Sequence, residues 1–217
     1  MQTNALNEGA LGRRGVRERV LGSSAGWTLW KKVIGADEAT GEFVREFVCP
    51  APGEWVLDVG CGVGDTIEHL PEDITYVGID FNPAYIQAAT DKHPKGRFIV
   101  ASVDDLPALG LDRFDCVIAQ NMLHHLSDDQ VRALVASLPA VMRPGSRFVT
   151  SDNVWDEDQS TTARVLIALD RGRNVREAHR YAELIGAHFT DVAITVRHDM
   201  LRIPYTHCLV QARLPAA

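Results

Sequence analysis

The chain has 217 residues, of which 46% are hydrophobic and 24% charged, and its formal net charge is −7. These values are ordinary for a globular protein with one α/β domain, and the negative charge disfavours a nucleic-acid binder. No apolar run reaches the roughly 18 residues of a membrane span. The four cysteines form no CxxC pair, which argues against a zinc site or a disulfide framework. We therefore expect a cytoplasmic protein with reduced thiols, and no metal, nucleic-acid or membrane partner.

The first 50 residues predict helices. Residues 37–48 place four apolar side chains on one helical face: Ala39, Phe43, Val44 and Phe47. Pro50, Pro52 and Gly53 then interrupt the chain. We therefore divide the sequence into an N-terminal helical segment, residues 1–50, and a second unit, residues 51–217.

Short apolar strands alternate with helices in the second unit. We expect strands at 55–59, 75–79, 97–101, 114–119, 147–151, 191–196 and 206–213. We expect helices at 65–70, 83–91, 127–141, 161–169 and 175–185. Strands separated by helices form βαβ units, and these predict a mainly parallel sheet. The last two strands have no helix between them, so we expect them to be antiparallel.

A glycine-rich turn follows the first strand. The segment VLDVGCGVGD, residues 56–65, is a buried strand that leads through three closely spaced glycines into a helix. Glycines let the chain turn sharply and let a ligand approach the backbone, and a helix start offers unpaired N–H groups. Nicotinamide enzymes have GxGxxG, whereas this loop has GxGxG followed by Asp65, whose carboxylate would sit badly beside a pyrophosphate. The spacing therefore argues against a nicotinamide-dependent oxidoreductase.

An acidic residue ends the second strand. In TYVGID, residues 75–80, Asp80 lies at the distance from the loop at which α/β nucleotide folds place a ribose-binding carboxylate. The alternative is that Asp80 only caps the helix that starts at Pro83. The glycine loop before it favours the ribose interpretation.

Four motifs follow one another along the chain: VLDVGCGVGD, VGIDFNP, VDDLP and FDCVIAQNMLHHL. In this order and spacing they resemble the class I methyltransferase superfamily, over residues 53–151. The resemblance implies an α/β Rossmann-like fold, with a seven-stranded mainly parallel sheet, helices on both faces and antiparallel last strands. It also implies S-adenosylmethionine as the cofactor. Residues 1–50, with Trp27 and Trp30, would then form a lid over the active site.

The resemblance further implies which residues bind the cofactor. Asp58, Gly60 and Gly62, with Cys61 and Gly64 in the same loop, would surround the methionine part. Asp80 would bind the ribose and Phe81 would lie against the adenine. Ser102 and Val103 would also contact the adenine, although family members often have Asp in place of Ser102, so this contact could shift to Asp104. Gln120 would lie near the amino group of the cofactor.

The acceptor is expected to be a small molecule. The Asn- or Asp-Pro-Pro-aromatic motif of DNA and protein amine methyltransferases is absent after the fourth strand, where this chain has Gln120-Asn121-Met122-Leu123. His124 and His125 follow, and a neutral imidazole there could take a proton from a hydroxyl or an amine. We name both as candidate catalytic residues and favour His125. The alternative is that they pack the loop.

Three further groups of polar residues have competing interpretations. Asp152 and Asn153 resemble the magnesium pair of catechol-type methyltransferases, but Gln120 or Asn121 stands where those enzymes have an Asp, so we expect no metal. A helical stretch carries Arg171, Arg173, Arg176 and Arg180, and a solvated face with Glu177 and Glu183 is favoured over an anion site. Residues that border the last two strands could form a pocket rim or pair across strands: Arg197, His198, Arg202, Tyr205 and His207.

These observations favour an S-adenosylmethionine-dependent methyltransferase that acts on an O or N atom of a small molecule. Two alternatives remain. One is a protein that binds S-adenosylmethionine without catalysis, and the other is a nicotinamide-dependent oxidoreductase.

Overall fold

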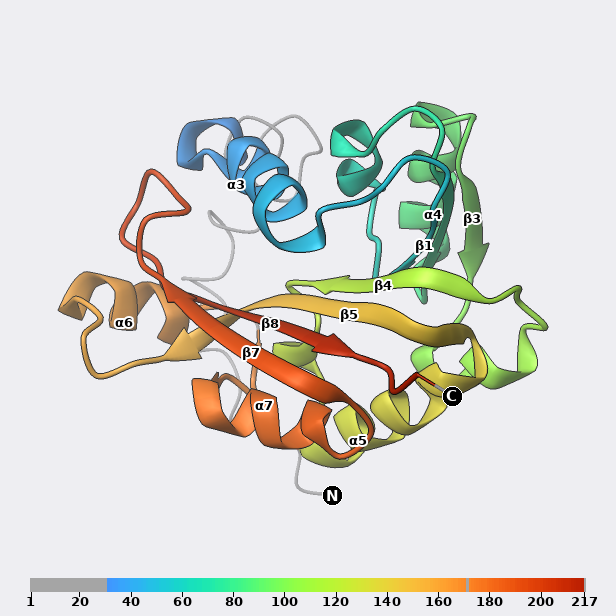
Figure 1. The fold of residues 1–217 in the computed structure, drawn as a ribbon. Helices are drawn as coiled ribbons and strands as arrows, with labels where there is room; N and C mark the ends of the chain where they lie inside the picture. The colour runs from blue at the N-terminus through green and yellow to red at the C-terminus, as the bar shows by residue number, and fades with distance from the viewer. Residues whose placement is uncertain (1–30, 171, 217) are drawn as a thin grey trace, which may run out of the picture.

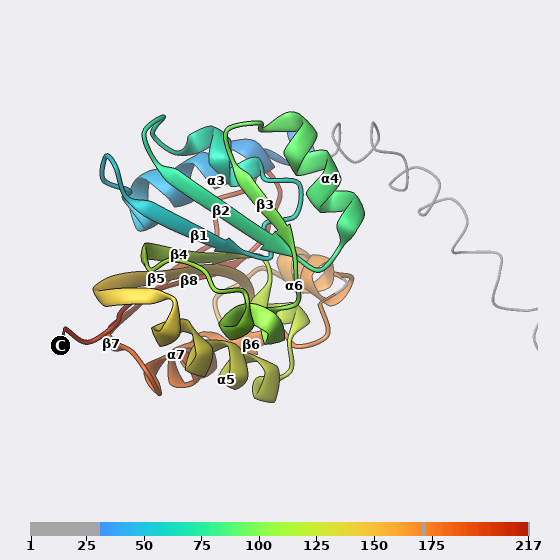
Figure 2. The same ribbon diagram turned by 90° about the vertical axis from the view of Figure 1, so that its right-hand side faces the viewer.

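The computed structural model describes residues 31–170 and 172–216 of the chain. Trp27, Trp30 and Arg171 lie outside the described residues. The sheet has the order β3-β2-β1-β4-β5-β8-β7, and a short strand, β6, pairs with β5 (Figure 1 and Figure 2). The strands are β1 (Trp55–Val59), β2 (Thr75–Asp80), β3 (Arg97–Val100), β4 (Phe114–Gln120), β5 (Met142–Trp155), β6 (Arg176–Glu177), β7 (Thr190–Arg197) and β8 (His207–Arg213).

The helices connect these strands on both faces of the sheet. The α-helices are α3 (Ala36–Phe43), α4 (Pro83–Lys92), α5 (Asp128–Ser137), α6 (Thr161–Ala168) and α7 (Ala178–Gly186). The 3₁₀-helices are η2 (Asp65–His69), η3 (Val103–Ala108), η4 (Leu123–His125) and η5 (Leu138–Ala140), while η1 (Val44–Val48) is a π-helix. None of the described helices is long and apolar enough to cross a membrane.

The strand directions match those expected from the sequence. Strands β1 to β5 pair in parallel, because a helical connection returns the chain to the same edge of the sheet each time. Strand β8 runs antiparallel to both β5 and β7. The prediction of a mainly parallel sheet with antiparallel last strands is therefore confirmed.

Helices cover both faces of the sheet (Figure 2), and a hydrophobic core lies on each face. Helix α3 and the start of η1 bury Phe43 and Val44 on one face, together with Val56, Ile118 and Leu209 of the sheet. Helices α5 and α7 close the other face over the second core. The three layers explain why the strands are almost continuously apolar, since both of their faces are buried.

The described part of the N-terminal segment belongs to the first core. Ala39, Phe43, Val44 and Phe47 are all buried there, which confirms the expected apolar face. Ion pairs from Arg197 to Glu42 and from Arg202 to Glu38 also attach α3 to the β7–β8 region. The division of the chain at residue 50 stays a prediction.

The structure differs from the expected elements in three places. Strand β5 spans Met142–Trp155 rather than 147–151, because β8 pairs with it as far as Asn153 and β6 pairs with Val154 and Trp155. The expected helix at 175–185 begins only at Ala178, because Arg176 and Glu177 pair with the end of β5 and form an eighth strand. The expected helix at 127–141 ends at Ser137 and continues as η5.

Candidate functional site

The glycine loop lies at the carboxyl end of β1, between β2 and β4, where the strand order reverses. Open α/β sheets bind ligands at such points. Gly60, Gly62 and Gly64 have φ values of 77°, 55° and 78°, which side chains rarely tolerate. A Cβ on Gly60 would lie 2.6 Å from Cγ of Met122, whereas one on Gly62 would meet nothing within 4 Å. The backbone at Gly62 is therefore open to a ligand, and Gly60 is needed for packing.

Asp80 ties the glycine loop to the end of β2. Its Oδ2 accepts a hydrogen bond of 3.0 Å from the Gly62 N–H, and its Oδ1 accepts one of 2.8 Å from the Asn82 N–H. The cap of α4 is Asn82, whose side chain accepts from the Ala84 N–H at 3.0 Å. The alternative interpretation of Asp80 as a mere helix cap is therefore wrong. A carboxylate offers about four acceptor positions, so two remain at Asp80.

Asp58 lies beneath the loop and is only 1% exposed. Its Oδ2 accepts a hydrogen bond of 2.7 Å from the Tyr76 hydroxyl. Burial raises the pKa of Asp58 to about 6, and bonds from Tyr76 and Thr66 partly oppose this rise. Asp58 is therefore a buried carboxylate that is bonded to Tyr76 and Thr66.

Cys61 packs inward from the same loop. A Cβ on Gly78 would lie 2.7 Å from the Cys61 sulfur, so the glycine in β2 makes room for this side chain. Burial raises the pKa of the Cys61 thiol well above its usual value. Cys61 is therefore a packing residue and a poor nucleophile.

The expected adenine contacts lie side by side at the ends of β2 and β3, where Asp80 pairs with Val100. The side chain of Phe81 is 77% exposed. Ser102 caps η3, and its hydroxyl accepts a bond of 3.4 Å from the Asp104 N–H. Asp105 completes the capping box with its bond to the Ser102 N–H. The Ser102 hydroxyl therefore shapes the turn, while Phe81 offers an open aromatic face.

Gln120 ends β4 and contacts the N-terminal segment. Its Nε2 donates to the Thr40 hydroxyl over 3.3 Å. This bond brings α3 against the carboxyl end of β4, next to the glycine loop.

The two histidines lie in η4, directly after β4. Nδ1 of His124 is 2.7 Å from Oδ1 of Asp152, which also accepts a bond of 3.0 Å from the His124 backbone N–H. Both side chains are buried, and burial raises the pKa of Asp152. His125 is exposed, and its ring centroid is 4.1 Å from that of His124. Sequence reasoning missed the His124–Asp152 pair, because it placed Asp152 in a loop after the strand.

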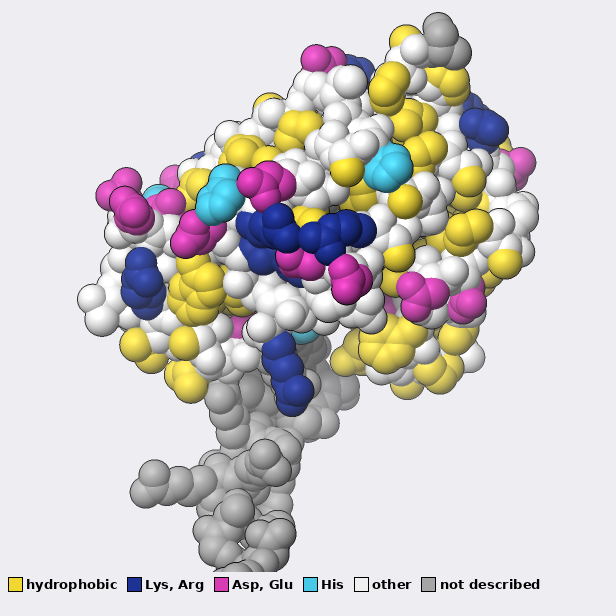
Figure 3. Space-filling model, turned by 90° about the horizontal axis from the view of Figure 1, so that it is seen from below, with side chains coloured by type: hydrophobic (Ala, Val, Ile, Leu, Met, Phe, Trp, Pro, Cys, Tyr) yellow, Lys and Arg dark blue, Asp and Glu magenta, His cyan; other side chains and the backbone are white. Residues whose placement is uncertain are grey.

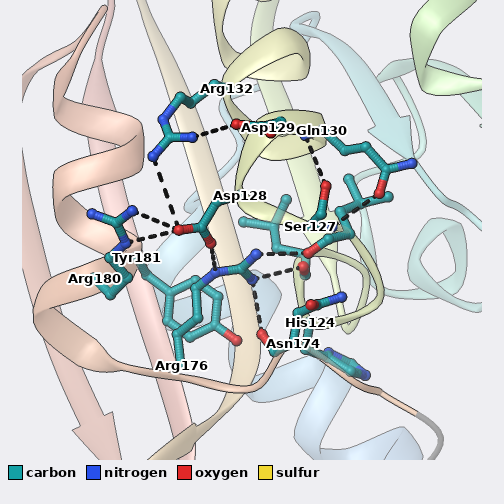
Figure 4. Close-up of polar contacts among 12 residues, drawn as sticks. His124, Ser127, Asp128, Asp129, Gln130, Arg132, Asn174, Arg176, Arg180 and Tyr181 are labelled. Atoms are coloured by element: carbon teal, nitrogen blue, oxygen red, sulfur yellow. Dashed lines mark hydrogen bonds and ion pairs between the residues drawn. The ribbon is translucent and has the colours of Figure 1, made fainter.

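Arg176 holds the segment that carries these histidines (Figure 4). Its guanidinium donates to the carbonyls of Leu123 at 3.0 Å and Leu126 at 2.6 Å, and pairs with Asp128 at 2.7 Å. The side chain is buried in a strand, so the prediction that Arg176 belongs to a solvated helix face is wrong. Arg180, on α7, does pair with Glu183 at the surface.

Arg197 and Arg202, two of the basic residues near the last two strands, form ion pairs within the protein. Arg197 pairs with Glu42, Glu46 and Asp199 rather than bordering a pocket. Figure 3 shows basic and acidic side chains intermixed on the lower face of the molecule. Arg132 on α5 pairs with Asp129. These cations are therefore neutralised by neighbouring carboxylates.

Within residues 31–170 and 172–216, no three His, Cys, Asp or Glu side chains lie close enough together to hold a metal ion. Asp152 and Asn153 are neighbours in β5, so their side chains point to opposite faces of the sheet. They therefore do not form a chelating pair.

Comparisons with known proteins found methyltransferases that are similar to this chain. The methyltransferase domain family matches residues 56–145. An uncharacterized methyltransferase of Synechocystis is 28% identical over 55% of this chain and 56% of its own length. An O-methyltransferase of Penicillium expansum is 36% identical over 58% of this chain and 46% of its own. The chain thus spans about half the length of these curated relatives.

A solved structure shares the fold over most of the chain. The SAM-dependent methyltransferase from Archaeoglobus fulgidus superposes with a TM-score of 0.69 over 86% of this chain and 99% of its own, at 17% identity. At that identity the likeness supports the fold alone, whereas the matched segment 56–145 contains the glycine loop, Asp80 and the two histidines. Through this segment, the chain is similar to the methyltransferase domain family, and its fold is that of a solved S-adenosylmethionine-dependent methyltransferase.

Proposed function

We propose that this protein transfers a methyl group from S-adenosylmethionine to an O or N atom of a small molecule. The observation that carries the proposal is the open glycine loop, tied by Asp80 to the end of β2 at the point where the strand order reverses. Relatives named O-methyltransferase and phosphoethanolamine N-methyltransferase support the choice of O or N. We also propose that it acts in the cytoplasm and without a metal ion.

The residues of the loop fit such a cofactor. Gly62 leaves room for a ligand above the backbone, and Asp80 keeps two acceptor positions for ribose hydroxyls. Phe81 presents an exposed aromatic face, on which an adenine ring could stack. The Asp58 carboxylate beneath the loop would favour the positive charge of an amino group.

The cofactor supplies a methyl group that its sulfonium already activates. The protein then needs to hold the acceptor atom in line with that methyl group and to keep water away. Such positioning can lower the barrier by about 7–11 kcal/mol. Helix α3, which contacts Gln120 at the end of β4, would cover one side of the position where the acceptor lies.

The His124–Asp152 pair is suited to receive the proton of the acceptor. Asp152 accepts the Nδ1–H, which leaves the lone pair on Nε2 of His124. The same carboxylate stabilises the imidazolium that forms after the proton moves. This geometry makes us propose His124 as the base, while the preference for His125 from sequence stays a prediction.

Calorimetry with the full chain tests the proposal. We expect S-adenosylhomocysteine to bind and NAD and NADP not to bind. Tight nicotinamide binding would overturn the methyltransferase proposal. Binding of the cofactor without turnover on any hydroxyl or amine acceptor would instead support the non-catalytic alternative.

A further inference from the structure

Two residues that pair across β5 and β8 each carry a buried polar atom without a partner in the described part of the chain. Asn153 pairs in register with His207, and their side chains are 1% and 6% exposed. Oδ1 of Asn153 and Nδ1 of His207 have no hydrogen-bond partner among residues 31–170 and 172–216. A buried polar atom without a partner costs about 1–3 kcal/mol, so a pair of them calls for an explanation.

The orientation of the Asn153 amide follows from its neighbours. Its Nδ2 donates to the Tyr205 hydroxyl over 3.0 Å and to Oδ2 of Asp170 over 3.5 Å. The Tyr205 hydroxyl in turn donates to the same Asp170 oxygen over 2.7 Å. Since Asp170 accepts only, the amide nitrogen must point to it, and Oδ1 of Asn153 must be an acceptor.

The pair lies on the α3 face of the sheet, close to the proposed methyl-transfer site. Side chains alternate along a strand, so Asn153 points to the same face as Val149, and His207 to the same face as Leu209. Val149 and Leu209 both belong to the core beneath α3. Gln120, at the end of the neighbouring strand β4, reaches α3 on that face as well.

We propose that Asn153 and His207 form an acceptor subsite that binds a hydroxyl or amino group of the methyl acceptor. This inference rests on the proposed function and names the substrate class. Oδ1 of Asn153 requires a hydrogen-bond donor, and a hydroxyl or amine can serve His207 at the same time. An ionised carboxylate or phosphate has only acceptor oxygens and cannot donate to Oδ1 of Asn153. The acceptor therefore presents hydroxyl or amino groups there, and no carboxylate or phosphate.

The protonation of His207 agrees with this chemistry. Burial and, to a smaller extent, His124 lower its pKa to about 4, so the imidazole is neutral at pH 7. A neutral ring does not attract an anion, which again favours an uncharged or cationic acceptor group.

NMR of the full chain with S-adenosylhomocysteine tests the subsite. The probes are catechol and 2-aminophenol, compared with phthalate, which carries two carboxylates on the same ring. We expect the two donors to shift the Asn153 side-chain amide and the His207 ring signals, and phthalate to leave them unchanged. The subsite is refuted if phthalate shifts these signals or if neither donor does.

Two variants complete the test. His207→Phe keeps the ring that packs against Tyr205 at 5.2 Å and removes an atom that has no described partner. We expect its melting temperature to stay equal or rise, and its dissociation constant for catechol to rise about fivefold to tenfold. The matched control is Thr206→Val, whose hydroxyl is bonded to Gln159 and lies 3.2 Å from Nδ1 of His198. It should melt at a lower temperature and bind catechol normally.

The two proposals fail in different ways. Loss of S-adenosylhomocysteine binding to the unmodified chain would overturn the proposed function. Normal binding of that product, with equal catechol affinity in His207→Phe and the unmodified chain, would overturn the subsite alone.

Discussion

The charge of Asp58 should make the free protein less stable at neutral pH. The carboxylate is buried beneath the glycine loop, and burial raises its pKa from 3.8 to about 6. The Asp58→Asn substitution removes the charge and keeps an oxygen that can accept the Tyr76 hydroxyl. We therefore expect this substitution to stabilise the free protein at neutral pH.

The sign and size follow from the pKa. Because the folded value lies above the unfolded one, the folded state binds the Asp58 proton more tightly, and ionisation favours unfolding. A rise of about two units corresponds to about 3 kcal/mol. Above a pH of about 6, the ionised Asp58 lowers the unfolding free energy by this full amount. The effect disappears as the pH falls towards about 4.

Urea denaturation of both proteins at pH 4.5 and pH 8 measures the effect. We expect Asp58→Asn to raise the unfolding free energy by up to about 3 kcal/mol at pH 8 and much less at pH 4.5. The control is Asp115→Asn, because Arg143 and the Trp55 N–H lower the pKa of the Asp115 carboxyl. This substitution should therefore lower the unfolding free energy, and by more at pH 8 than at pH 4.5. An equal change for Asp58→Asn at both pH values, or a loss at pH 8, would refute the reasoning.

Three further substitutions test the site. Asp80→Ala should weaken S-adenosylhomocysteine binding by tenfold or more in calorimetry, since each charge-assisted bond contributes about 1.5–3 kcal/mol. Its circular dichroism spectrum should stay unchanged, and an unchanged dissociation constant would contradict the ribose contact. Asp152→Asn should slow turnover by about 10²–10⁴-fold and leave cofactor affinity intact, because the amide no longer selects the tautomer of His124. Normal turnover of this variant would contradict the role of His124 as the base and favour His125. Arg176→Met should lower the unfolding free energy by about 3–5 kcal/mol in urea, because the carbonyls of Leu123, Leu126 and Asn174 lose a charged donor, although Asp128 keeps its pair with Arg180. A loss below about 1 kcal/mol would show that water replaces the guanidinium.

The amino-acid sequence by itself determined the features that depend on short stretches of chain. The order of strands and helices follows from local hydrophobic patterns, and the parallel sheet follows from that order. The glycine loop and Asp80 were also predictable, because a turn at the end of a buried strand needs glycines whatever the rest of the chain does. The helical face of Phe43 and Val44 belongs to this group as well.

Contacts between distant residues decided the acceptor side of the site. His124 and Asp152 are 28 residues apart, and only the pairing of β5 with β8 extends the strand far enough to bury Asp152. Arg176 was expected on a helix, since its own neighbours give no sign that it will pair with the end of β5. Strand register depends on the partner strand, so no local pattern could place Asn153 opposite His207.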